Sequence, residues 1–216
     1  MAAAEYDRWP WQAVWQRTEA PIILSWLGEG NGHRVLDLGA GTGSYLHRLD
    51  SAGFAGVGLD ISAAMLAIAA RRLRGTRATL TVGDARHLPF KAATFARILM
   101  TRVLSHIDDA TAVFGEARRI LAPGGNLVLS DVDPAHDYSH TELPFAGTEI
   151  RVATYKRSLE SLVEMARTYG GFSMPKHRII RARDLLPPSQ TRLLSSIDVC
   201  DNRPVAFIAE FNSGQA

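Results

Sequence analysis

The sequence predicts an α/β fold in which a mostly parallel β-sheet carries helices on both faces. Two observations support this prediction. Short apolar runs alternate with stretches of helical periodicity between residues 33 and 132, which is the pattern of consecutive β-α-β units. The length of 216 residues and the hydrophobic fraction of 46% suit one domain with a full core. We find no internal repeat and no second boundary, and we expect a single domain over residues 1–216.

The apolar runs locate the strands of the first part, and the periodic stretches locate the helices between them. Strands are predicted at 33–38, 55–60, 76–82, 94–100 and 125–131, with helices at 43–52, 62–73 and 108–121. Ser62 and either Asp108 or Asp109 are predicted N-caps, because short polar side chains bond the free amides at helix starts. The Pro-Gly-Gly sequence at 123–125 is expected to end the third helix and turn the chain into the next strand.

Both ends of the chain are predicted to cover this sheet. The segment 5–27 contains four tryptophans and reads as one or two amphipathic helices, broken at Pro10 and Pro21. After Asp131 we expect an irregular polar stretch to about residue 148, followed by a helix near 157–169 that ends at two glycines. Two closing strands are predicted at 176–182 and 204–211.

Charge and cysteine content restrict the classes of partner. The 24 basic and 22 acidic residues leave a net charge of +2, which is too small to indicate a nucleic-acid partner. The single cysteine, Cys200, excludes an internal disulfide and a multi-thiolate metal site. The first residues lack the pattern of a signal peptide, and no apolar run reaches membrane-spanning length. We therefore expect a soluble cytoplasmic protein with no membrane contact.

A glycine-rich loop follows the first predicted strand. Residues 35–43 read Val-Leu-Asp-Leu-Gly-Ala-Gly-Thr-Gly, and a helix is expected directly after them. Glycines at such a junction let the backbone turn sharply and let a ligand lie against the main chain. Asp60 ends the next strand, where a carboxylate can accept hydrogen bonds from ribose hydroxyls. The alternative for Asp60 is an N-cap, a role that Ser62 can fill instead. A nucleotide-type ligand is predicted.

Four segments in order resemble the class I S-adenosylmethionine-dependent methyltransferases. They are the glycine loop at 35–43, Gly-Leu-Asp-Ile-Ser at 58–62, Gly-Asp-Ala with Leu-Pro-Phe at 83–90, and Arg-Ile-Leu-Ala-Pro-Gly-Gly-Asn-Leu at 119–127. The resemblance is close over 33–132 and looser to 211. It implies a Rossmann-like sheet of seven strands with the last strand antiparallel, and S-adenosylmethionine as cofactor. A nicotinamide oxidoreductase would carry a further glycine where Ser44, Tyr45 and Leu46 stand.

The resemblance also implies roles for named residues. Asp37 would orient the methionine amino group, and the main chain of Gly39, Ala40 and Gly41 would pass against the cofactor. Asp60 would bind the ribose, Ile61 one face of the adenine, Asp84 and Ala85 the adenine edge, and Thr101 the methionine part. Two alternatives stay open: Asp37 as a buried carboxylate that holds loop amides, and Asp84 as the first residue of an Asx-turn.

The same resemblance divides the chain into four parts. Residues 1–30 would form a helical lid, 31–132 the cofactor-binding core, 133–172 a substrate-side insert with its helix, and 173–216 the closing strands. The acceptor is expected over the carboxyl ends of strands four and five, between the lid and the insert.

The candidate catalytic residue there is His106, which acts either as a base or as a residue that closes a turn. The predicted substrate-side residues are Tyr6, Trp9, Trp11, Asp131, Asp133, His136, Tyr138 and, as a further candidate, His140. Methyl transfer is an in-line displacement, so the protein mainly aligns the acceptor and excludes water. We expect no metal, because residues 133–140 lack the spacing of a known metal site and suit a polar substrate-facing loop better.

A small-molecule acceptor is the favoured hypothesis, either a metabolite or a natural-product intermediate. The chain has no predicted recognition domain, and Thr-Arg-Val-Leu stands at 101–104 in place of the Asn-Pro-Pro-Tyr signature of base and amide methylation. The alternatives are a peptide or protein acceptor, a non-catalytic cofactor-binding module and a nicotinamide oxidoreductase. The sequence leaves the acceptor atom and the oligomeric state open.

Overall fold

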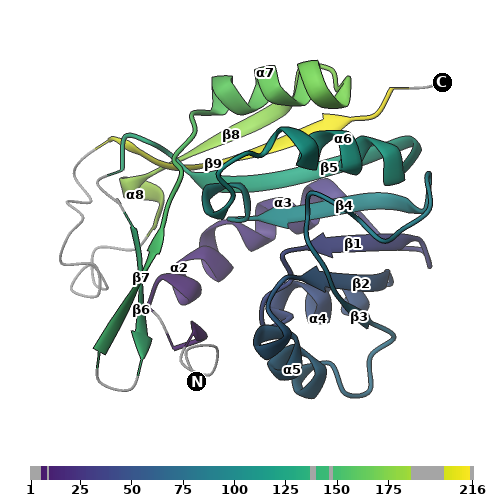
Figure 1. Cartoon of the computed structure of the whole chain (residues 1–216), viewed down its shortest axis with the longest axis horizontal. Helices are drawn as coiled ribbons and strands as arrows, with labels where there is room; N and C mark the ends of the chain where they lie inside the picture. Colours follow the sequence, from purple (N-terminus) through teal and green to yellow (C-terminus); the bar gives the residue numbers. More distant parts are fainter. Residues whose placement is uncertain (1–5, 9, 137–139, 146–147, 186–201, 215–216) are drawn as a thin grey trace.

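A seven-stranded β-sheet forms the centre of the computed structural model, which describes residues 6–8, 10–136, 140–145, 148–185 and 202–214. Its strands, in spatial order, are β3 (Thr79–Val82), β2 (Ala55–Asp60), β1 (Arg34–Leu38), β4 (Phe95–Thr101), β5 (Leu121–Val132), β9 (Pro204–Asn212) and β8 (Lys176–Arg181) (Figure 1). The first five are parallel to one another, and β9 runs antiparallel to both β5 and β8. The predicted Rossmann-like fold with an antiparallel last strand is confirmed.

Alternating side chains build a separate core on each face of the sheet. Leu36 and Leu38 of β1 join the core beneath α6 (Thr111–Ile120) and α7 (Leu159–Gly170), whereas Val35 joins the other core. That second core is covered by α2 (Pro10–Thr18), α3 (Ala20–Leu27), α4 (Ser44–Ser51), α5 (Ala63–Arg72) and α8 (Ala182–Leu185). Because both faces are covered, the central strands are almost wholly apolar.

Local signals set most of the helix ends. Ser62 caps α5 and accepts a hydrogen bond from the amide of Met65, as predicted. The prediction for α6 is wrong at its start: the helix begins at Thr111, and the cap is Ala110 without a side-chain bond. The carboxylate of Asp109 instead accepts from the amide and the hydroxyl of Thr111. Asp109 therefore shapes the turn before the helix and does not cap it.

The fifth strand is longer than predicted. It begins at Leu121, so the Pro-Gly-Gly sequence at 123–125 lies inside β5 and does not separate it from α6. The pairing of β4 with β5 shifts register between Phe95 and Arg97, which marks a bulge. An added Cβ on Gly125 would stand 2.8 Å from the carbonyl oxygen of Ala96. Glycine is therefore required for the strands to approach closely here.

The expectation of an irregular polar stretch after Asp131 is also wrong. Strands β6 (His140–Phe145) and β7 (Thr148–Ala153) pair antiparallel with each other and form a separate two-stranded sheet. In Figure 1 this hairpin projects away from the main sheet, near α2. Since the hairpin makes its hydrogen bonds internally, it does not need the alternating apolar pattern of a strand in the main sheet. Within the described ranges, no helix combines the length and apolarity needed to cross a bilayer.

Candidate active site

A cavity of about 360 Å³ lies at the carboxyl ends of β1, β2 and β4. This is where the strand order reverses, the usual ligand site of an open α/β sheet. Segments far apart in sequence line it: Tyr6, the glycine loop, the end of β2, the turn at 83–86, the loop after β4, Val132 and Val152. Of the predicted residues, the lining includes Tyr6, Gly39, Gly41, Asp60, Ile61, Asp84, Ala85, Thr101 and His106.

In the glycine loop, main-chain atoms that carry no side chain line the cavity. Gly39 and Gly41 have φ angles of 79° and 53°, in the left-handed region that favours glycine. A Cβ added to Gly41 would meet no described atom within 4 Å, so only the missing side chain keeps this surface open. The amides of Gly41 and Ser62 each donate to the carboxylate of Asp60 at 2.8 Å. These bonds fix Asp60 at the cavity wall while each oxygen keeps room for a further donor.

Asp37 lies beneath the glycine loop and is 2% exposed. Burial raises the pKa of this carboxyl to about 7, and the charge of Asp60 adds to the effect, whereas Arg102 opposes it. The site is therefore rich in carboxylates at its floor. A group that carries positive charge, such as the amino group or the sulfonium of S-adenosylmethionine, relieves that excess, so the residues present fit this cofactor.

The turn at the predicted adenine end is held by a residue that the sequence interpretation missed. The carboxylate of Asp84 accepts from the amide of Arg86 at 2.9 Å and from its guanidinium at 2.8 Å and 3.1 Å. The first of these bonds is the Asx-turn left open as an alternative role for Asp84. Hydrogen bonds from Arg86 lower the pKa of Asp84. Asp84 is thus a fixed anionic acceptor at the wall, next to the buried Ala85 and the exposed Ile61.

The loop after β4 forms the opposite wall, and it carries His106 on a short 3-10 helix, η1 (Leu104–His106). Asp131 does not reach the cavity wall. It is 4% exposed and accepts hydrogen bonds from the amides of Ser105 and Val132, at 2.9 Å and 2.8 Å. Burial raises the pKa of Asp131. The structure places Asp131 outside the cavity lining, where it supports the loop at Ser105, and its contact with an acceptor stays a prediction.

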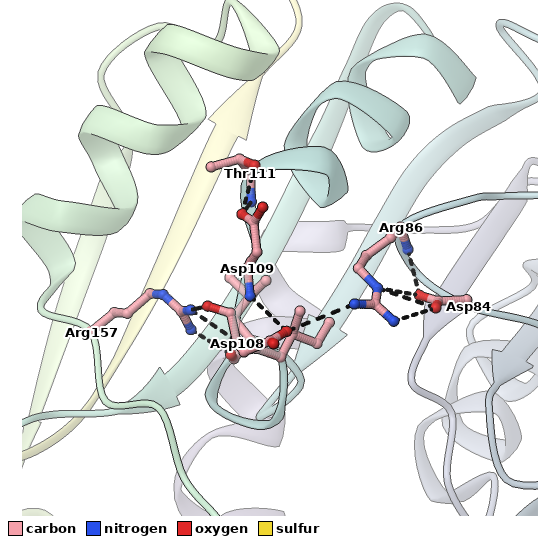
Figure 2. Close-up of polar contacts among 8 residues, drawn as sticks. Asp84, Arg86, Asp108, Asp109, Thr111 and Arg157 are labelled. Atoms are coloured by element: carbon pink, nitrogen blue, oxygen red, sulfur yellow. Dashed lines mark hydrogen bonds and ion pairs between the residues drawn. The ribbon is translucent and has the colours of Figure 1, made fainter.

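Two arginines hold the same loop from opposite sides (Figure 2). The guanidinium of Arg157 donates to the carbonyl oxygens of Leu104 and Ile107, at 2.7 Å and 2.8 Å, and to that of Asp108. From the other side, Arg86 lies 3.7 Å from the carboxylate of Asp108. The loop that presents His106 is therefore tied both to the segment before α7 and to the adenine-side turn.

Three other predicted substrate residues lie outside the cavity lining. The ring of Trp11 stacks on the ring of Trp15, with the centroids 5.0 Å apart. The rings of Trp11 and His136 have an edge-to-face arrangement, with the centroids 5.6 Å apart. Asp133 closes a turn by accepting from the amide of Ala135 at 2.8 Å. Packing within the N-terminal layer and turn formation account for these side chains. Trp9 and Tyr138 lie outside the described residues, and for His140 only the backbone pairing with Ala153 is described.

Arg102 and Glu19 form a buried ion pair beside the cavity that the sequence interpretation did not predict. Arg102 lines the cavity, and its guanidinium donates to Glu19, which is fully buried. Each left a signal. Arg102 is a charged residue directly after the apolar strand that ends at Thr101, and Glu19 precedes the apolar run of α3. A buried ion pair is weak evidence for stability, and charged residues that lie beside a cleft are candidates for a functional site.

Known proteins agree with this geometry. A family model described as a methyltransferase domain matches residues 35–125. A demethylmenaquinone methyltransferase of Tropheryma whipplei is 37% identical over 122 residues, which are 55% of this chain and 48% of that protein. The chain thus spans about half the length of the curated relatives it matches.

Solved structures match over a larger part of the chain and show the fold. An S-adenosylmethionine-dependent methyltransferase of Mesorhizobium loti has a TM-score of 0.73 at 21% identity and covers 90% of this chain and 97% of its own. Phosphoethanolamine N-methyltransferase 2 of Haemonchus contortus, solved with S-adenosylmethionine, has a TM-score of 0.69 at 21% identity, covering 94% and 52%. Residues 35–125 thus match a methyltransferase domain, and the chain has the fold of S-adenosylmethionine-dependent methyltransferases of known structure.

Proposed function

We propose that this protein transfers the methyl group of S-adenosylmethionine to a small, largely apolar molecule that carries an ionisable hydroxyl or carbon acid. One observation carries the proposal: His106 shares a single cavity with the glycine loop and Asp60. Beyond the cofactor-binding residues, the lining includes Val103, Ile107, Val132 and Val152. Such a lining suits the burial of an apolar acceptor and the exclusion of water.

His106 is the proposed base. The alternative, that this residue closes a turn, needs no imidazole, because the turn is closed by the backbone amide of His106, which donates to the carbonyl of Val103 at 2.9 Å. The side chain is exposed on a loop that Arg157 and Asp131 hold in place. An imidazole on a loop with a fixed backbone can accept a proton from the acceptor as the methyl group arrives.

The competing acceptors are disfavoured on specific grounds. A peptide would need an extended groove, whereas the site is a single cavity of about 360 Å³. The net charge of +2 supports no polyanionic partner. The relative from Tropheryma whipplei is named for a quinone, which is an apolar small molecule. We place the activity in the cytoplasm, where a chain with a single cysteine keeps its thiol reduced.

Transfer of an isotope-labelled methyl group tests the proposal. The purified protein is incubated with methyl-labelled S-adenosylmethionine and a cell extract that has been separated by size into small molecules and macromolecules. We expect label in a small, organic-soluble product that is heavier by one methylene. His106→Ala should abolish the product while retaining cofactor binding, because this exposed side chain supports no part of the fold.

The other outcomes each overturn a distinct part of the proposal. Label in the protein fraction would identify a peptide or protein acceptor. Cofactor binding without label in either fraction, across extracts of several sources, would indicate a non-catalytic binding module. Full activity of His106→Ala would remove the base and leave alignment of the acceptor as the source of catalysis.

A further inference from the structure

A largely buried arginine lies close enough to Asp37 for its charge to oppose the rise in the pKa of that carboxyl. Arg102 follows β4, lines the cavity, and keeps only 11% of its side chain exposed. One of its terminal N–H groups donates to Glu19, whose carboxylate also accepts from the hydroxyl of Ser130 at 3.0 Å. The guanidinium carbon lies 5.5 Å from the ring of Trp15. The cation therefore has a fixed position beside the ligand cavity.

A contribution to the stability of the fold does not by itself explain why Arg102 and Glu19 are buried as an ion pair. A buried ion pair seldom stabilises a fold more than apolar side chains of equal volume would, because both charges lose their hydration. Arg102 also has a φ angle of 53°, which is unfavourable for any residue with a Cβ. Within the described part of the chain, the buried Nε–H group of Arg102 has no hydrogen-bond partner. A strained, buried cation with donors to spare indicates that a ligand completes the site.

We propose that Arg102 binds the α-carboxylate of the methionine part of S-adenosylmethionine and that Glu19 is its positioning residue. An amino-acid head group carries a carboxylate and an ammonium group on one carbon, so its site needs a cation and an anion side by side. Arg102 lines the cavity and interacts electrostatically with Asp37, which is buried beneath the glycine loop, so the two residues supply that pair. The proposal rests on the cofactor assignment above and adds the residue that selects the carboxylate.

Two ligands that differ only in this carboxylate provide the test. Calorimetry gives the dissociation constants of S-adenosylmethionine and decarboxylated S-adenosylmethionine for the wild type, for Arg102→Met and for Arg97→Met. Arg97 is the matched control, since it lies on the same strand at the opposite end and bonds only backbone carbonyls. We expect the wild type to prefer the carboxylated ligand by at least about tenfold, the effect of a charge-assisted hydrogen bond. Arg102→Met should lose this preference and Arg97→Met should keep it.

A second variant protects the test against misfolding. If Arg102→Met leaves Glu19 as an unpaired buried charge and does not fold, the double variant Glu19→Gln with Arg102→Met removes both charges. Circular dichroism confirms that each variant is folded before binding is measured. An unchanged preference in either folded variant would overturn the proposal. Failure of the wild type to bind either ligand would instead overturn the cofactor assignment, so the two failures are distinguishable.

Discussion

Replacement of Asp37 by asparagine should make the ligand-free protein more stable at high pH. The carboxyl of Asp37 has a pKa raised from 3.8 to about 7, chiefly because it is buried and next because Asp60 lies near. A group whose pKa is raised on folding binds more protons in the folded state, so stability falls as the pH rises from about 4 to about 7. Asparagine has nearly the same shape and carries no charge, so the variant escapes this loss.

The size of the effect follows from the shift. About three pKa units correspond to an upper bound on the order of 4 kcal/mol, which is fully developed only above pH 7. For a chain of this length the gain corresponds to a melting temperature roughly 10 °C higher. The variant should bind S-adenosylmethionine more weakly, because it lacks the negative charge that we expect to hold the methionine amino group. Asp37→Asn should therefore bind S-adenosylmethionine at least about tenfold more weakly.

Thermal unfolding of the ligand-free protein at about pH 4 and about pH 8 checks the prediction. The variant should melt at the wild-type temperature in acid and well above it at the higher pH. Glu29→Gln is the control, because this exposed carboxylate should change stability little at either pH. An equal difference at both pH values, or a variant that is less stable at about pH 8, would refute the assignment of a raised pKa to Asp37.

Two further predictions concern the walls of the cavity. Asp60→Ala should weaken the binding of S-adenosylhomocysteine at least about tenfold in calorimetry, since this carboxylate is the proposed acceptor for the ribose hydroxyls; an unchanged dissociation constant would refute that role. Arg157→Met should speed amide hydrogen exchange across residues 104–108, because three backbone carbonyls lose their donor. Arg167→Met, which removes only an exposed ion pair on α7, should leave that exchange unchanged, and equal exchange in both variants would show that Arg157 does not hold the loop.

The fold followed from the sequence because its signals are local and repeated. Each parallel strand is an apolar run, and each helix between strands shows its own period, so elements could be placed to within a few residues. The misplaced elements are those whose formation depends on partners. The Pro-Gly-Gly sequence alone predicts a break between a helix and a strand. In the structure it is accommodated as a bulge in the pairing of β4 with β5. The β6–β7 hairpin forms through the antiparallel pairing of its own two strands.

The cofactor side of the site was also accessible, since the glycine loop, Asp60 and Asp84 each follow a strand at a recognisable motif. The residues that support this site could not be predicted from the sequence in the same way. Glu19 meets Arg102 across 83 positions, and Arg157 reaches the loop before α6 across about 50. A charged residue beside an apolar run marks Glu19 and Arg102 individually, but a contact between such distant positions leaves no local pattern. The sequence could not place Asp131 relative to the cavity lining, because a polar residue at a strand end can face either the cavity or the loop beneath it.

The β6–β7 hairpin forms a separate sheet, which bears on how the proposed acceptor specificity could change. The hairpin contributes Val152 to the cavity, yet among the residues that the structure describes it has no strand pairing with the seven-stranded sheet. Its length and composition can therefore be altered without disturbing the hydrogen bonds that hold the cofactor loop. Exchange of the hairpin between relatives offers a modular route to redesigned acceptor specificity on an unchanged cofactor platform.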